Sequence, residues 1–311
     1  MQNSHHHEST PAVGLCLADG ASWNIVAENP EAELFIKRLA GVMGLSSANG
    51  VGRKLAIQVQ EGEGADTELG RMPGSLKSLF GEALADYPWE EECSPLKVNI
   101  SCNLYQHEDE NHETLQLIHL SSVFVLDAVT RGGMLLHGAL IEREGMGMIL
   151  AGPGGVGKTT ACSRLPEPWQ VLSDDITLIV RDRTGKYWAH PWPTWSRFTV
   201  EKVGGSWDVG RGIELQAICF LNQSQEMDMV YIGKGEMVCL TMESIEQANR
   251  LLRKRLKEES FRKLSNLHFR NVCKMVESIR GYHLSLDLET HFWEFLDGLL
   301  GVEIGRNLDE R

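Results

Sequence analysis

Apolar and polar residues alternate twice near the start of the chain, over 12–17 and 22–27, which predicts two strands joined at Ala18-Asp19-Gly20. Asn29 and Pro30 predict a helix start. The next segment repeats apolar side chains at helical spacing, and they form one face: Leu34, Phe35, Leu39, Val42 and Met43. Residues 97–105 predict a strand, and residues 113–130 predict a helix that stops at Gly132-Gly133. We expect a disordered tail over 1–10 and an α+β accessory domain over 11–130.

The pattern changes after residue 130. Apolar strands are predicted over 134–142 and 148–151, followed by a short helix that Pro166 and Pro168 prevent from continuing. Further strands are predicted over 169–173, 176–181, 186–189, 217–221 and 229–232, helices over 242–257 and 259–279, a returning strand over 282–286 and a last helix through Leu300. This order predicts an α/β core over 131–240, with a C-terminal helical extension over 241–311 packed on it.

Composition narrows the classes of partner. The formal net charge of −13 argues against nucleic acid, which needs a basic face. No apolar run approaches the roughly 18 residues of a membrane helix, and the polar start does not look like a signal peptide. The seven cysteines are scattered without a C-x-x-C pair, so neither a disulfide framework nor a zinc site is indicated. We expect a cytoplasmic protein with no nucleic-acid or membrane partner.

Residues 152–159 complete the phosphate-loop pattern G-x-x-x-x-G-K-[ST]. Its glycines let backbone N–H groups turn toward phosphate oxygens, Lys158 supplies a charge for the β- and γ-phosphates, and Thr159 supplies a hydroxyl for Mg²⁺. An apolar run enters the loop, and Thr159-Thr160 can open a helix whose N-terminus faces an anion. A glycine-rich turn without function is the weaker interpretation. The predicted ATP-binding residues are Gly152, Pro153, Gly154, Gly155, Val156, Gly157, Lys158, Thr159 and Thr160.

Asp174 and Asp175 follow the next predicted strand. In phosphate-loop proteins an acidic residue at a neighbouring strand end helps to hold Mg²⁺, and a second can accept a proton from an attacking hydroxyl. An exposed turn is the alternative. His137 lies in an apolar strand, where a histidine is usually a hydrogen-bonded core residue; because the neighbouring strand enters the loop, a place near the phosphates is equally open.

Three further features each have two interpretations. The segment 190–196, with two prolines and two tryptophans, is either the wall of a pocket or a loop packed on the core, and we favour the pocket. Arg197 and Arg211 are either phosphate contacts or the ordinary arginines that any surface loop carries. The basic stretch over 250–257 is by default a solvated helix face, and an anchor for an acidic peptide is the weaker interpretation.

The ordered set of His137-Gly-Ala-Leu, the loop, and Leu172-Ser-Asp174-Asp175 resembles the HPr kinase/phosphorylase-like proteins. Together with Ala189–Ser196, it looks more narrowly like the ScmC proteins of the SynChlorMet cassette. The resemblance implies a fold related to phosphoenolpyruvate carboxykinase and transfer of the γ-phosphoryl group of ATP to a serine-type hydroxyl. By position, Lys158 and Thr159 would hold phosphates and Mg²⁺, Asp174 would be the general base, Asp175 a metal or positioning carboxylate, and His137 an active-site residue near the phosphates.

The chain departs from that family in one signature. The Glu-x-Arg-Gly of HPr kinases is absent; the corresponding stretch, around 207–215, carries Asp208, Arg211 and Glu214 instead. We therefore expect a substrate other than the sugar-transport protein, namely a precursor peptide or small protein in a peptide-modification pathway. HPr kinases are homo-oligomers, so the resemblance allows a homo-oligomer here. The alternatives are a non-catalytic nucleotide-binding scaffold and a kinase for a small hydroxylated molecule.

Overall fold

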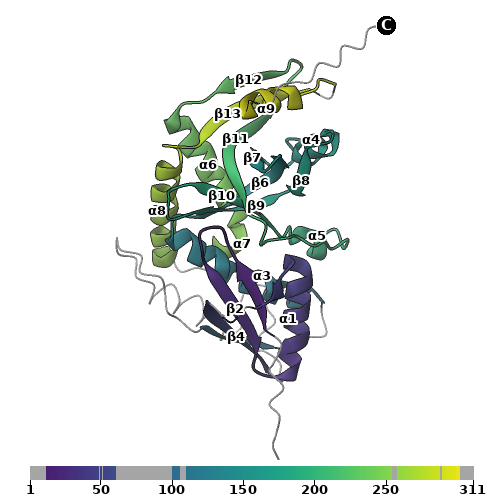
Figure 1. Ribbon diagram of the computed structural model, residues 1–311, viewed down its shortest axis with the longest axis vertical. Helices are drawn as coiled ribbons and strands as arrows, with labels where there is room; N and C mark the ends of the chain where they lie inside the picture. The colour runs from purple at the N-terminus through teal and green to yellow at the C-terminus, as the bar shows by residue number, and fades with distance from the viewer. Residues whose placement is uncertain are drawn as a thin grey trace, which may run out of the picture.

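The computed structural model describes residues 12–48, 50, 52–60, 100–105, 110–253, 258–287 and 289–301 of the 311 residues. The protein is a mixed α/β structure with two sheets and several helices (Figure 1). The expected tail over 1–10, and Lys254, Arg255 and Lys257 of the basic stretch, lie outside the described residues. Among the helices within these ranges, none is both long and apolar enough to cross a bilayer.

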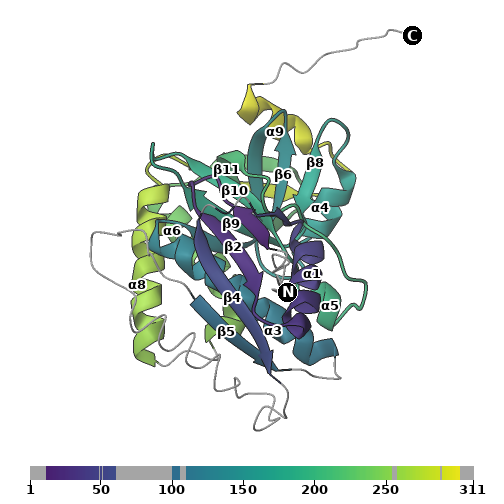
Figure 2. The same ribbon diagram turned by 60° about the horizontal axis from the view of Figure 1, so that its bottom comes forward.

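The N-terminal sheet has five strands in the order β3-β1-β2-β4-β5. They are β1 (Val13–Cys16), β2 (Ser22–Ala27), β3 (Ser46–Ser47), β4 (Arg53–Gln60) and β5 (Ile100–Tyr105). Strands β2, β4 and β5 are parallel, and helix α1 (Pro30–Met43) connects β2 toward β4 (Figure 2).

The buried face of α1 differs from the sequence prediction at one position. Leu34 is 71% exposed, whereas Ala32 and Ile36 are buried beside Phe35 and Leu39. The spacing of apolar residues could not show whether Leu34 or Ile36 borders the buried face of the helix, because both residues lie at helical spacing from the other apolar side chains.

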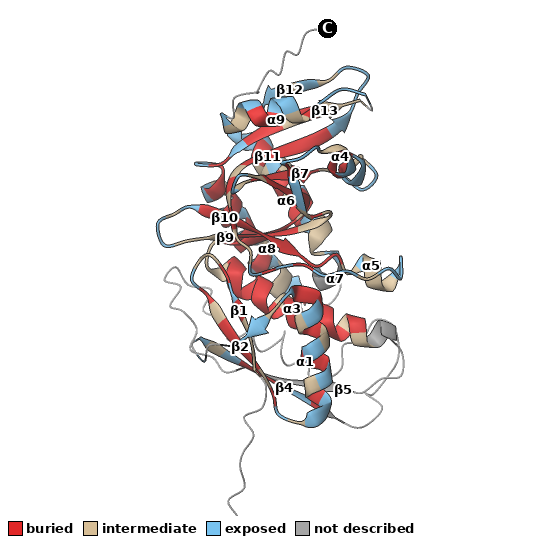
Figure 3. Ribbon diagram, turned by 45° about the vertical axis from the view of Figure 1, so that its right-hand side comes forward, coloured by how far each residue is buried: buried red, intermediate tan, exposed pale blue. Residues whose placement is uncertain are grey.

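Helix α3 (Glu110–Thr130) joins the two halves of the structure. Its residues Phe124 and Val129 are buried in one hydrophobic cluster that also contains Leu15 and Ile25 of the first sheet and Val180 of the second. Arg131, just after the helix, forms ion pairs with Asp127 and Asp19. The N-terminal sheet therefore packs through α3 onto the rest of the chain (Figure 3).

The second sheet has eight strands. Their order is β10-β9-β6-β7-β11-β13-β12, β8 pairs with β6, and β10 also pairs with β11, so five strands close into a ring. The strands are β6 (Met134–Arg143), β7 (Met146–Ala151), β8 (Gln170–Ser173), β9 (Ile176–Arg181), β10 (Tyr187–Trp192), β11 (Ile213–Gln223), β12 (Asp228–Tyr231) and β13 (Arg280–Leu286).

Successive residues of a strand point to opposite sides of the sheet, and here both sides are apolar. Helices therefore cover both faces. Leu140 and Ile149 pack with helices α6 (Lys234–Ala248) and α8 (Glu258–Met275). On the other face, Ile141 and Leu150 pack with α4 (Lys158–Arg164) and α9 (Trp293–Leu300). The short helices α5 (Ser196–Thr199) and α7 (Arg250–Arg253) lie in connections.

Several predicted boundaries differ from those of the observed elements. The boundary expected at residue 240 falls inside α6, which ends at Ala248 rather than continuing to 257. The segment after 241, expected to be a helical extension, also contributes β13, which corresponds to the returning strand predicted over 282–286 and pairs with β11 and β12. That segment is therefore partly sheet, and the division into domains stays a prediction.

Candidate functional site

The glycine-rich loop 152–157 connects β7 to α4. Gly152, Gly155 and Gly157 have φ angles of 147°, 79° and 107°, a region that side chains other than glycine rarely adopt. A Cβ added at Gly154, Gly155 or Gly157 would meet nothing within 4 Å. The loop therefore exposes its backbone to open space, as a loop that surrounds an anion must.

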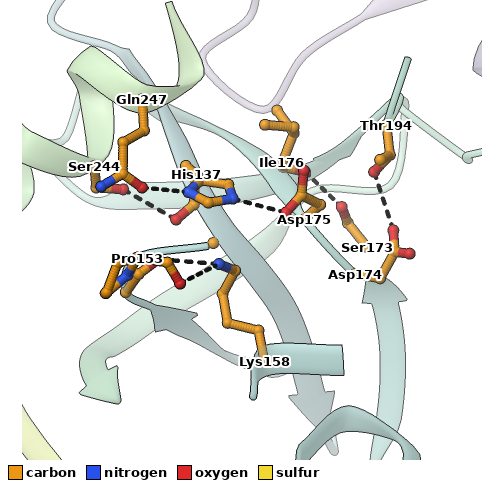
Figure 4. A network of polar contacts seen from close by, with 12 residues as sticks. His137, Pro153, Lys158, Ser173, Asp174, Asp175, Ile176, Thr194, Ser244 and Gln247 are labelled. Atoms are coloured by element: carbon orange, nitrogen blue, oxygen red, sulfur yellow. Dashed lines mark hydrogen bonds and ion pairs between the residues drawn. The ribbon is translucent and has the colours of Figure 1, made fainter. Parts of the chain in front are cut away.

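Lys158 points back into this loop from the first residue of α4. Its Nζ donates hydrogen bonds to the carbonyl oxygens of Gly152, at 2.9 Å, and Pro153, at 3.4 Å (Figure 4). The residue is only 6% exposed, and burial lowers the pKa of its ammonium group, while the carboxylate of Asp175 acts in the opposite direction. A buried cation thus lies under an exposed loop.

The paired aspartates lie at a bend between β8 and β9. Both strands pair with β6, at Leu140–Ser173 before the bend and at His137–Ile176 after it. The hydroxyl of Ser173 donates across the bend to the carbonyl of Ile176, at 2.5 Å. β8 and β9 thus pair with the same strand, and the bend between them interrupts that pairing at Asp174 and Asp175. The side chains of the two aspartates contact different residues.

His137 links Asp175 to helix α6. Its Nε2 lies 2.8 Å from Oδ1 of Asp175, and its Nδ1 lies 2.5 Å from Oε1 of Gln247. The amide nitrogen of Gln247 donates a hydrogen bond to the carboxylate of Glu243. This bond orients the amide so that its oxygen faces His137. Both ring nitrogens of His137 are therefore engaged, one by the carboxylate of Asp175 and the other by the amide of Gln247.

Burial raises the pKa of Asp175, but the hydrogen bond from His137 and the positive charges of His137 and Lys158 outweigh it. The pKa of Asp175 therefore lies below its ordinary value, and its carboxylate lies beside the imidazole of His137 and near the ammonium group of Lys158. The strand register explains the arrangement: Gly138 pairs with Ala151, so His137 lies beside the start of the loop.

Asp174 faces away from His137. Its Oδ1 accepts a hydrogen bond from the Thr194 hydroxyl at 3.0 Å, and its Oδ2 lies 3.3 Å from the guanidinium of Arg197. Burial raises the pKa of the nearby Cys162 thiol to about 12, and the negative charge of Asp174 adds to this effect. The two aspartates are thus neighbours in sequence with separate partners.

Two cavities flank these groups. One, the loop cavity, has a volume of about 590 Å³ and is lined by Gly155, Gly157, Thr160, Gln223 and Asp287 among others. The other, the tryptophan cavity, has a volume of about 250 Å³. Its wall includes Asp175, Trp192, Thr194, Trp195, Ser122 and Gln247. None of its lining residues belongs to the glycine-rich loop.

The structure brings most of the predicted site residues together. His137 contacts Asp175 directly, and the charge of Lys158 acts on the same carboxylate. Thr159 and Thr160 begin α4 in exposed positions. Arg197 reaches Asp174. Arg211 does not reach the loop, because its guanidinium pairs with the buried carboxylate of Glu142, toward the other end of β6.

The segment 190–196 combines both of its interpretations. Trp192 to Ser196 line the tryptophan cavity, while Trp192 is only 2% exposed and His190 is fully buried, with Nδ1 at 2.8 Å from the carbonyl of Val209. Ser244 and Gln247 were missed by the sequence analysis. Their i, i+3 spacing puts both on the face of α6 that meets β6, and Ser244 donates to the His137 carbonyl.

Among the described residues, no group of three or more His, Cys, Asp or Glu side chains could hold a metal ion.

A search of curated proteins finds no match to this chain. A family model described as "SynChlorMet cassette protein ScmC" matches residues 100–301, which include the loop, the bend and both cavities. The match covers well over half of the chain, which therefore belongs to the ScmC family of SynChlorMet cassette proteins.

Proposed function

We propose that this protein is an ATP-dependent kinase that transfers the γ-phosphoryl group to a serine-type hydroxyl of a peptide or small protein. The observation that carries the proposal is the buried Lys158 ammonium beneath an exposed glycine-rich loop, with the ionised Asp175 and His137 beside it. Phosphoryl transfer needs little covalent chemistry from a protein and depends on positioning and charge neutralisation. These groups offer both.

The loop residues fit the triphosphate of ATP. Gly154, Gly155 and Gly157 leave space where a Cβ would lie, and their backbone groups are accessible. Lys158 would then supply charge to the phosphates from a fixed position. The loop cavity begins at Gly155 and Gly157 and extends past Thr160, so it is the space into which the nucleoside would continue.

Mg²⁺ fits the donor set as an ion that arrives with the nucleotide. The Thr159 hydroxyl and the Asp175 carboxylate are the protein groups that would hold it, and Mg²⁺ commonly binds through one or two protein oxygens with phosphates and waters completing the shell. When bound, it would neutralise charge on the phosphate oxygens.

Asp174 is the better candidate for the general base. Asp175 already accepts a hydrogen bond from His137, and its lowered pKa makes it a weak proton acceptor. Asp174 has a neutral partner in Thr194 and a longer contact with Arg197. In the proposed step the acceptor oxygen bonds to the γ-phosphorus, the bond from that phosphorus to ADP breaks, and the hydroxyl proton passes to Asp174.

Three wider parts of the proposal each have their own support. The order of His137, the loop and the aspartates supports an HPr-kinase-like core. The family's description as a cassette protein supports partner proteins, with a precursor peptide as acceptor. The described cysteines carry free thiols, which supports a reducing, cytoplasmic location.

Two observations favour a second candidate, a nucleotide-binding scaffold without turnover. Both oxygens of Asp174 already have partners, and Arg211 of the stretch that lacks Glu-x-Arg-Gly is held by Glu142. Incubation with Mg²⁺, γ-labelled ATP and a library of serine peptides separates the two. Labelled peptide supports the kinase, whereas nucleotide that is bound without labelled peptide or ADP supports the scaffold.

A further inference from the structure

We propose that the tryptophan cavity receives an uncharged aromatic or large aliphatic side chain of the acceptor, next to the residue that carries the hydroxyl. This inference rests on the proposed function, because it identifies the second substrate of the same site. Asp175 forms part of the cavity wall, and Thr194, another wall residue, donates its hydroxyl to Asp174. A group held in the cavity therefore lies beside both aspartates.

The size of the cavity suits one side chain. Sites that enclose a whole small molecule usually have about 300–1,000 Å³. The tryptophan cavity has about 250 Å³, whereas the loop cavity, with about 590 Å³, falls inside that range. The smaller cavity is thus suited to part of a larger ligand, as expected for one residue of a peptide that otherwise remains outside.

Several polar groups in the wall already use a donor or acceptor within the protein. The hydroxyls of Ser121 and Ser122 both donate to the carbonyl of Ile118. The amide of Asn249 donates to the carbonyl of Ile245, and Gln247 is occupied by His137. A polar guest would lose its water without gaining equivalent partners, so an apolar guest is favoured.

The apolar part of the wall is held in place by packing. Leu135, Ile176 and Trp192 come from strands of the main sheet or their ends, and the Trp195 ring lies 5.8 Å from the ring of Phe198. Flat, fixed rings favour contact with another ring or a broad aliphatic group. The wall contains one acidic residue, Asp175, and one basic residue, Arg250, so its charge favours neither an anionic nor a cationic guest.

The first test measures binding without turnover. Saturation-transfer NMR compares N-acetyl-tryptophanamide with N-acetyl-alaninamide on the full chain and on Ser122→Phe, whose larger side chain fills the cavity. Ser278→Phe is the matched control, since Ser278 is exposed and its hydroxyl likewise donates to a helix carbonyl, that of Met275. We expect the tryptophan amide alone to bind, with affinity reduced about tenfold or more only in Ser122→Phe.

The second test measures selectivity with γ-labelled ATP and serine peptides that vary on both sides of the serine. An aromatic residue at one flanking position should raise transfer about tenfold over alanine, and Ser122→Phe should remove the preference. Should Ser122→Phe fail to fold, Trp195→Ala provides the same comparison by removing one wall.

The outcomes separate the two proposals. Transfer without a flanking preference, or a preference that Ser122→Phe leaves intact, overturns the cavity assignment while the kinase stands. Absence of probe binding also overturns it. Probe binding that depends on Ser122, in a protein that neither binds nucleotide nor transfers phosphate, supports the cavity as a binding site and removes the kinase.

Discussion

Nε2 of His137 lies 2.8 Å from Oδ1 of Asp175, although the two residues are 38 positions apart in the sequence. The contact exists because β6 pairs with β7 on one side and with β9 on the other. His137 therefore lies between the start of the glycine-rich loop and the bend that carries Asp175. One histidine thereby connects the cationic and acidic parts of the proposed site.

Lys158→Ala should weaken binding of Mg²⁺ and the ATP analogue AMPPNP by on the order of a hundredfold, because it removes the buried charge under the loop. Isothermal calorimetry measures this directly. Lys186→Ala is the control, since Lys186 is exposed and pairs with Glu214. Equal affinities for the two variants would mean that Lys158 does not contact the nucleotide.

His137→Ala should raise the pKa of Asp175, because it removes the hydrogen bond and the charge that oppose the effect of burial. A carboxylate with a lowered folded pKa adds stability above its unfolded pKa of about 3.9 and loses it as the pH falls through the folded value. Acid unfolding of the variant should therefore begin at higher pH.

Carbon-13 NMR titration of the aspartate carboxyl groups follows this pKa, with Asp175→Asn identifying the resonance. His291→Ala is the control, because the imidazole of His291 is exposed and faces Glu294. A pKa of Asp175 that is unchanged in His137→Ala would contradict the assigned hydrogen bond.

Cys162 should resist alkylation in the folded protein. Burial, then the charge of Asp174, raises the pKa of its thiol to about 12, and the thiolate is the reactive form. Cys16 and Cys239 are exposed and should react with iodoacetamide first. Peptide mass spectrometry at pH 8 gives the order, and early modification of Cys162 would show that this side of α4 opens in solution.

Gly133→Ala should lower the free energy of unfolding by about 1–3 kcal/mol. An added Cβ would lie 2.6 Å from the carbonyl oxygen of Ile179 and 2.8 Å from that of Ala128, which are backbone atoms of β9 and α3. Gly235→Ala, in α6 with nothing within 4 Å, is the control. Urea unfolding compares them; similar midpoints would mean that α3 is not packed closely on the sheet.

The sequence predicted those parts of the site that depend on neighbours along the chain. The loop, the strand that enters it and the adjacent aspartates are local patterns, and their positions agree with the structure. The partners of His137 were not predictable, because Gln247 lies 110 residues away and reaches the histidine only through the packing of α6 on β6. Arg211 shows the reverse: only the fold reveals that Glu142, rather than the loop, lies within its reach.

The most direct test of the proposed function is the initial rate of phosphoryl transfer from γ-labelled ATP to a serine-peptide library, for the unaltered chain and for Asp174→Asn. Intact-mass analysis of the peptides confirms the addition of one phosphoryl group. The kinase proposal predicts labelled peptide, with a rate at least about a hundredfold lower in Asp174→Asn although Mg²⁺·AMPPNP still binds. Full activity in Asp174→Asn would contradict the assigned base, and bound ATP without labelled peptide or ADP would contradict the kinase.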